Sequence, residues 1–146
     1  MIQKHRACKI LLLLLLVIAM AVPVQAAETQ QPVSPYASYY LDAYNSYICD
    51  LGSGQFQIWF EVWGVGLMDE VGTLSIELYE VKSDGSLKWV KTFQHNNYSS
   101  MLAYNDYYNI SYVSFQGSSS KTYKAYVCIW AGKNGSGDTR YMWATE

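Results

Sequence analysis

The sequence has few of the residues that most enzymes and metal proteins use for their chemistry. Its 146 residues include two histidines, three cysteines and three prolines, and only 15% are charged. The one histidine after residue 26, His95, lies in a polar stretch that matches no pattern of a nucleophile held by a base. No segment has zinc-ligand spacing or the twelve-residue calcium loop. We therefore expect no catalytic residue, no metal and no cofactor.

Paired carboxylates are the one form of catalysis that such a sequence leaves open. Glycoside hydrolysis needs two acids that meet in space, and sequence spacing alone cannot reveal them. Asp69, Glu70 and Asp106 are the candidates, although loop acids of this kind are usually just solvated. A small secreted hydrolase is therefore the weakest of the alternatives.

The N-terminus predicts export. Lys4, Arg6 and Lys9 precede the apolar run Ile10–Val22, and Val24-Gln25-Ala26 has small residues where a signal peptidase requires them. The run has about 13 residues, whereas a membrane-spanning helix needs about 20. We predict a signal peptide at 1–26, cleavage before Ala27, and a secreted protein without a stable membrane span.

Basic residues are scarce in the remaining 120 residues (146 − 26). Three of the ten basic residues and none of the twelve acidic ones are removed, so the formal charge is 7 − 12 = −5. Nucleic acids and anionic membranes need clustered Lys and Arg, so we expect neither as a partner. We expect the protein to be a monomer. We expect its partner to be an unknown extracellular protein, an envelope component or a glycan.

Two cysteines remain after cleavage, because Cys8 lies in the signal peptide. An even number of cysteines in an oxidising compartment favours a disulfide. A bridge between Cys49 and Cys128 would close a loop of about 80 residues and stabilise the fold by roughly 4–5 kcal/mol.

Helical periodicity is missing after residue 27, and alternating apolar and polar residues take its place. At 55–63, the side chains of Phe56, Ile58, Phe60 and Val62 share one face. We expect further strands at 36–51, 73–81, 87–93, 109–115, 121–131 and 139–145, and an irregular connection at 94–106. The prediction is a flexible leader at 27–35 and one antiparallel β-sandwich of about seven strands at 36–146.

The strand at 121–131 has two possible orientations. Tyr123-x-Ala125-x-Val127-x-Ile129-x-Ala131 resembles the penultimate strand of a fibronectin type III domain, whereas Tyr126-Val127-Cys128 resembles the Tyr-x-Cys of immunoglobulin domains. The first orientation buries five small or apolar side chains and leaves Lys124 in water, so we favour it. Cys128 then lies on the outer face, as Cys49 does.

The chain also resembles an uncharacterised family of small exported proteins of Gram-positive bacteria. The residues that carry the resemblance are Ser34-Pro35-Tyr36, Met68-Asp69-Glu70-x-Gly72, Val90-x-x-Phe93, Tyr123-x-Ala125-x-Val127 and Gly135-x-Gly137-Asp138-x-Arg140. The resemblance implies export and this fold, and it implies no activity.

Aromatic residues are unusually common, at 16% of the chain, with 14 Tyr and five Trp. Several fall on strand faces opposite the expected core: Trp59, Trp63, Tyr126, Trp130, Tyr141 and Trp143. An exposed aromatic row is typical of a binding surface, unless loops or the 36–47 segment cover it. We expect a non-catalytic binding module, with a carbohydrate-binding module that uses these aromatics as the alternative.

Overall fold

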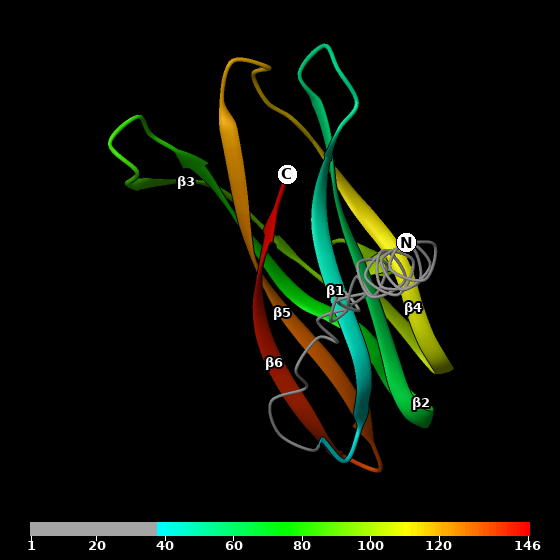
Figure 1. Cartoon of the computed structure of the whole chain (residues 1–146). Coiled ribbons are helices and arrows are strands. Elements are labelled where there is room, and N and C mark those ends of the chain that lie inside the picture. Colours follow the sequence, from blue (N-terminus) through cyan, green and yellow to red (C-terminus); the bar gives the residue numbers. More distant parts are fainter. Residues whose placement is uncertain (1–37) are drawn as a thin grey trace, which may run out of the picture. The chain divides into compact units, whose positions relative to one another are not determined.

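The computed structural model describes residues 38–146, which form six β-strands and one short 3-10 helix (Figure 1). The expected signal peptide and leader lie outside the described residues. The elements are β1 (Leu41–Asp50), β2 (Gln55–Val81), β3 (Leu87–Gln94), η1 (Ser99–Met101), β4 (Leu102–Gln116), β5 (Thr122–Lys133) and β6 (Ser136–Thr145). Every recorded strand pair is antiparallel, so the all-β antiparallel prediction is confirmed.

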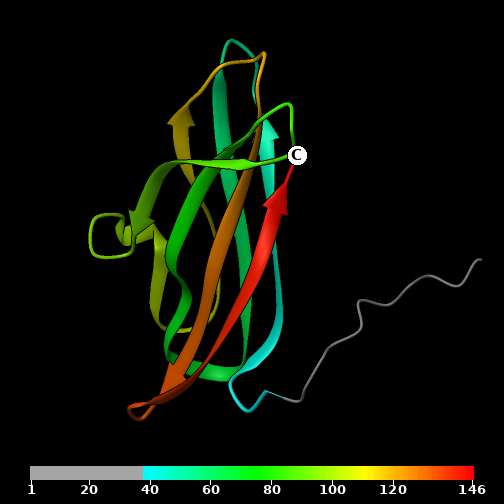
Figure 2. The same ribbon diagram turned by 90° about the vertical axis from the view of Figure 1, so that its left-hand side faces the viewer.

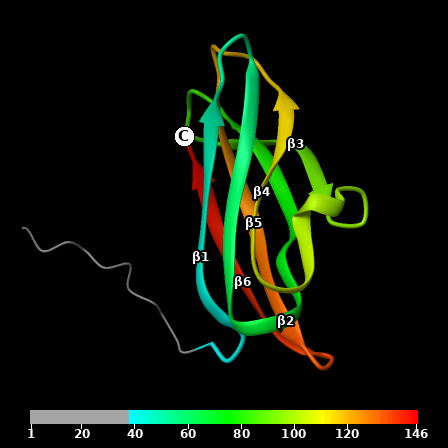
Figure 3. The ribbon, with the colours of Figure 1, turned by 90° about the vertical axis from the view of Figure 1, so that its right-hand side faces the viewer.

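The six strands belong to one hydrogen-bonded sheet, and β2 pairs with four of the others. Its first part, 55–63, pairs with β1 and β4, and its second part, 68–81, pairs with β3, β4 and β5. Between them β2 bends and runs back along the domain, and β4 turns beside it (Figures 2 and 3). The sheet therefore curls into a half-barrel around its core.

The expected sandwich of two separate sheets is not confirmed. Residues 55–63 and 73–81 were expected to be two strands, but they belong to one strand of 27 residues. Glycine permits the bend: a Cβ on Gly64 would lie 2.4 Å from Cγ of Met68, whose side chain occupies that space. β4 pairs with β2 on both sides of the bend, and the register between the two strands shifts between Trp63 and Met68.

The irregular connection expected at 94–106 is also shorter than predicted. β3 continues to Gln94, η1 follows a turn, and β4 already begins at Leu102. The Tyr98 ring packs edge-on against Phe93, with their centroids 5.2 Å apart. The ammonium of Lys91 lies 4.7 Å from the Phe93 centroid and donates to the Tyr98 hydroxyl, which fixes the turn.

The core lies inside the curl and follows the predicted alternation. Phe56, Ile58, Phe60 and Val62 are at most 1% exposed, and the favoured orientation of β5 is confirmed, because Tyr123, Ala125, Val127, Ile129 and Ala131 are all buried. A bulge between Thr73 and Ser75 turns Thr73 into the core and leaves Leu74 only partly buried. The bulge resets the alternation, so Ile76 and Leu78 still enter the core.

Asp138, at the start of β6, holds the beginning of β1. Its Oδ2 accepts the backbone N–H of Tyr39 at 2.9 Å and of Tyr40 at 3.2 Å, and the Ser38 hydroxyl donates to the same oxygen. The Ser38 hydrogen bond, followed by those from the two backbone N–H groups, lowers the pKa of Asp138. This clasp joins two strands that do not pair with each other in the sheet.

Candidate functional site

Aromatic residues are sorted by type between the core and the outer surface. Phe56, Phe60 and Phe93 are fully buried, and aliphatic side chains fill most of the remaining core. None of the five Trp is buried, and Tyr123 is the only buried Tyr among the 13 that the structure describes. Trp and Tyr are suited to a surface that contacts a partner, because each combines a large apolar ring with a polar group.

A row of three rings crosses the outer face of β1, β2 and β4. Tyr47, Trp59 and Tyr112 are register partners, so they stand side by side. The Tyr47 and Trp59 rings are nearly parallel with centroids 6.3 Å apart, and Trp59 and Tyr112 are 4.7 Å apart. Trp59 Nε1 donates to Gln57 Oε1 at 3.0 Å, which fixes the central ring. We call these residues the β1–β4 row.

Nothing in the described part of the chain covers the β1–β4 row. Tyr47 is 38% exposed and Tyr112 is 42% exposed. Trp63 lies four residues along β2, between Ala43 and Tyr108, and is half-buried. The sequence identified both tryptophans but not Tyr47 or Tyr112 as their neighbours, because strand pairing decides which rings meet.

A second group of rings lies on the outer face of β2, β5 and β6. Tyr126 stacks on Tyr141 with centroids 5.4 Å apart, and Trp143 lies 4.9 Å from Tyr126 and 5.8 Å from Tyr79. Tyr141 and Trp143 are 58% and 45% exposed. The Tyr79 hydroxyl donates to the Glu77 carboxylate, and this bond raises the pKa of Tyr79. We call these four aromatic residues the β5–β6 cluster.

The predicted aromatic surface is therefore two surfaces. Trp59 and Trp63 belong to the first half of β2 with β1 and β4, whereas Tyr126, Trp130, Tyr141 and Trp143 belong to β5 and β6. No recorded ring contact among residues 38–146 joins the two sets. All six residues lie on outward faces, as their alternation predicted.

The expected disulfide is not found, and both Cys49 and Cys128 carry free thiols. Cys49 lies opposite Gln57 and Cys128 lies opposite Ser75, so 18 residues of β2 separate their partners. The bend of β2 places the two thiols on outer faces of different halves of the sheet. Burial raises the pKa of the Cys128 thiol, whose register partners are Tyr141 on β6 and Ser75 on β2.

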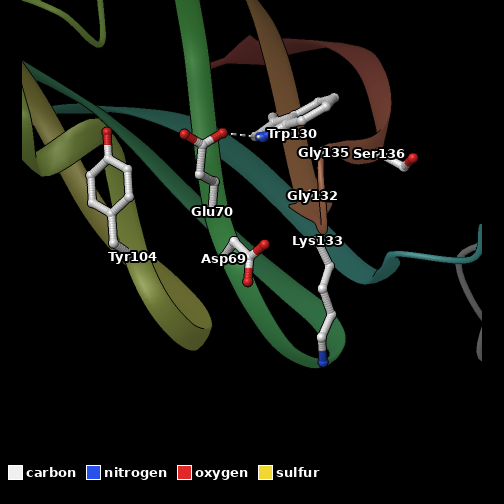
Figure 4. Close-up of a pocket in the computed structure, with 8 residues that line it drawn as sticks. All are labelled: Asp69, Glu70, Tyr104, Trp130, Gly132, Lys133, Gly135 and Ser136. Carbon is white, nitrogen blue, oxygen red and sulfur yellow. Dashed lines mark hydrogen bonds between the residues drawn. The ribbon is translucent and has the colours of Figure 1, made fainter.

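An open groove of about 450 Å³ adjoins the end of the β5–β6 hairpin (Figure 4). Its lining residues come from β2, β4, β5, the β5–β6 turn and the first residue of β6: Asp69, Glu70, Tyr104, Trp130, Gly132, Lys133, Gly135 and Ser136. Glu70 lies between Tyr104 and Trp130, because it pairs with Tyr104 on one side and Gly132 on the other. We call this the Trp130 groove.

The Trp130 indole is held in place at two points. Its Nε1 donates to Glu70 Oε2 at 3.0 Å. Its six-membered ring lies against the paired glycines Gly132 and Gly137, where an added Cβ would come within 2.5 and 2.4 Å of ring carbons. Gly132 and Gly137 lie together beneath the indole because they are register partners in β5 and β6.

The structure brings the candidate acids Asp69 and Glu70 together in the lining of the Trp130 groove, and neither Asp106 nor His95 is among the lining residues. Asp69 Oδ2 accepts the Asn134 N–H at 2.6 Å and Glu70 accepts the indole, so hydrogen bonds hold both carboxylates in the groove. Asp106 instead accepts the N–H of Tyr107 and pairs with Met68. The backbone N–H of His95 bonds to Leu74 in the turn after β3.

Three lysines lie around Glu80, near the C-terminal end of β2. Lys121 Nζ lies 2.8 Å from Glu80, and its hydrogen bond is the largest of the effects that lower the Glu80 pKa, with Lys88 and Lys82 adding to it. This concentration was not expected from a net acidic chain, and the pairing of β2 with β3 and β5 produces it.

No family model, no curated protein and no solved structure matches this chain. Within residues 38–146, no helix has the length and apolar character needed to cross a membrane. The same residues contain no group of three or more His, Cys, Asp or Glu side chains placed to hold a metal ion.

Proposed function

We propose that this protein is an exported, non-catalytic binding module that contacts an extracellular protein or envelope component through its outward aromatic rings. One observation carries the proposal: tryptophan is kept out of the core and tyrosine nearly so, while phenylalanine and aliphatic residues fill it. Clustered, exposed Trp and Tyr are the residues that dominate the energy of binding interfaces.

The β1–β4 row is the surface best built for a macromolecular partner. Its three rings stand side by side on paired strands on the outer face of the sheet. Exposed Ile110, 46% accessible, and Tyr108 extend the apolar area along β4. A patch of this kind on a protein in water is an association surface unless a partner covers it.

Export, the family resemblance and the finer fold belong to the same proposal. An immunoglobulin- or fibronectin type III-like relationship is supported by the inward Tyr123-x-Ala125-x-Val127 pattern of β5 and by the two halves of β2 that enclose one core. Export is supported by the pattern of residues 1–26. Intact-mass measurement of culture supernatant should then show a chain that begins at Ala27.

The binding proposal is tested with labelled protein added to Gram-positive cells and to isolated cell walls. We expect saturable binding that Trp59→Ala weakens by roughly tenfold or more. Trp89→Ala is the matched control, because Trp89 is 58% exposed but lies on β3, away from the β1–β4 row. Binding of the Trp59→Ala variant with unchanged affinity would remove the row from the proposal, and release of soluble product would favour the hydrolase alternative.

A further inference from the structure

We propose that the Trp130 groove is a subsite for one ring of a neutral saccharide. This inference rests on the proposed function, and it adds a ligand class and a location distinct from the β1–β4 row. It rests on three observations: an indole fixed against the sheet, polar groups of both hydrogen-bonding types around it, and an open groove of about 450 Å³.

The first step concerns the indole as a stacking platform. Cβ atoms of strand residues point out of the sheet, and those built on Gly132 and Gly137 would strike the Trp130 ring. The ring therefore lies over the outer face of the sheet at these two glycines, with one side against the backbone. Trp130 is only half-buried and lines the groove, so part of its ring is accessible to a ligand. The apolar face of a pyranose can stack on such a ring.

The second step concerns preorganisation. Glu70 fixes the indole nitrogen and the glycine pair fixes the distal edge, so the ring has little conformational freedom to lose when a ligand binds. A surface that is already ordered retains more of its contact energy as affinity. The groove thus differs from exposed Trp89, whose only recorded side-chain hydrogen bond is to Thr92, three residues away on the same strand.

The third step concerns ligand charge. The lining residues include Asp69 and Glu70 with their carboxylates and Tyr104 and Ser136 with their hydroxyls, whereas the side chain of Lys133 extends away from Trp130 (Figure 4). An anion would meet two carboxylates, and a small cation would meet carboxylates that each already accept an N–H group. A neutral polyol instead satisfies acceptors and donors together, since each sugar hydroxyl can donate and accept.

The test is calorimetric titration of the purified protein with four β-1,4-linked tetrasaccharides, built from glucose, xylose, mannose and N-acetylglucosamine. We expect at least one to bind at millimolar concentration or below. Trp130→Ala should weaken it by roughly thirtyfold, whereas Trp130→Phe, which keeps a stacking ring, should weaken it less. Trp89→Ala should bind as the parent does, because its register partner Tyr79 is nine residues from Glu70 along β2, about 30 Å.

A second pair of variants tests the platform without removing it. Gly137→Ala places a methyl group where the indole lies and should displace the ring, weakening saccharide binding. Gly66→Ala is the matched control, because a Cβ there meets no atom within 4 Å. Far-UV circular dichroism of each variant separates loss of binding from loss of the fold.

The outcomes distinguish this inference from the proposed function. If no tetrasaccharide binds, or if Trp130→Ala binds as the parent does, the subsite inference is wrong, while cell-wall binding that depends on Trp59 still stands on its own. If saccharide binding depends on Trp130 and cell-wall binding is insensitive to Trp59, the subsite inference stands and the β1–β4 row is not the cell-wall contact. Tetramethylammonium that binds and competes at Trp130 would overturn the choice of a neutral ligand.

Discussion

Replacing Phe60 and its neighbour Trp59 with alanine separates the core from the outer surface on adjacent positions of one strand. Phe60 is 0% exposed and lies in the single buried cluster. Truncation of a buried Phe leaves a cavity and costs about 3–5 kcal/mol of unfolding free energy. That is a large fraction of the stability of a small domain, so the Phe60→Ala transition should move to much lower denaturant concentration.

Trp59→Ala should cost less, but the structure does not make it neutral. The variant loses two ring contacts, with Tyr47 and Tyr112, each worth about 0.5–1.5 kcal/mol. Because the three rings are partly in water, we take the lower half of that range and expect about 1–2 kcal/mol in total. Trp63→Ala removes no recorded ring pair and should cost less than about 1 kcal/mol.

The assay is urea unfolding followed by far-UV circular dichroism, since fluorescence changes when a tryptophan is removed. Similar m-values across the three variants would show that the midpoint shifts report stability. The reasoning predicts the order Phe60→Ala, then Trp59→Ala, then Trp63→Ala, from most to least destabilising. A Trp59→Ala variant as unstable as Phe60→Ala would refute the outward placement of the row, and the binding proposal would lose its main support.

Two further predictions concern the clasp and the thiols. Asp138→Ala should lower the unfolding free energy by about 1–3 kcal/mol through loss of charge-assisted hydrogen bonds, which urea unfolding at neutral pH measures. Because folding lowers the pKa of Asp138, the stability that this carboxylate contributes is present above its unfolded-state pKa of about 3.9 and is lost as pH falls through its folded-state pKa. Parallel loss of stability by the parent and the Asp138→Ala variant below pH 4 would contradict this. Iodoacetamide should alkylate Cys49 in the native protein and Cys128 only slowly, because Cys128 is 8% exposed and its pKa is raised. A Cys49–Cys128 peptide in a non-reducing map would overturn the free-thiol assignment.

The sequence alone determined which face of each strand is buried. The alternation at 55–63 and 123–131 predicted the core residues correctly, since burying every second side chain leaves only one favourable orientation. The Asn-Gly pair at 134–135 is typical of a tight hairpin turn, and both residues have positive φ where they connect β5 to β6. The same local signals placed Trp59, Trp130 and the other candidate tryptophans on the outside.

Only the tertiary structure decided what those outward residues meet. Strand register joined Tyr47, Trp59 and Tyr112, residues 12 to 65 positions apart in the chain, and no local pattern encodes such pairing. The bend at 64–67 made two expected strands into one and carried Cys49 and Cys128 to different outer faces. Register also placed Gly132 and Gly137 beneath Trp130, because pairing between strands, and not the order of residues, determines which side chains share a surface.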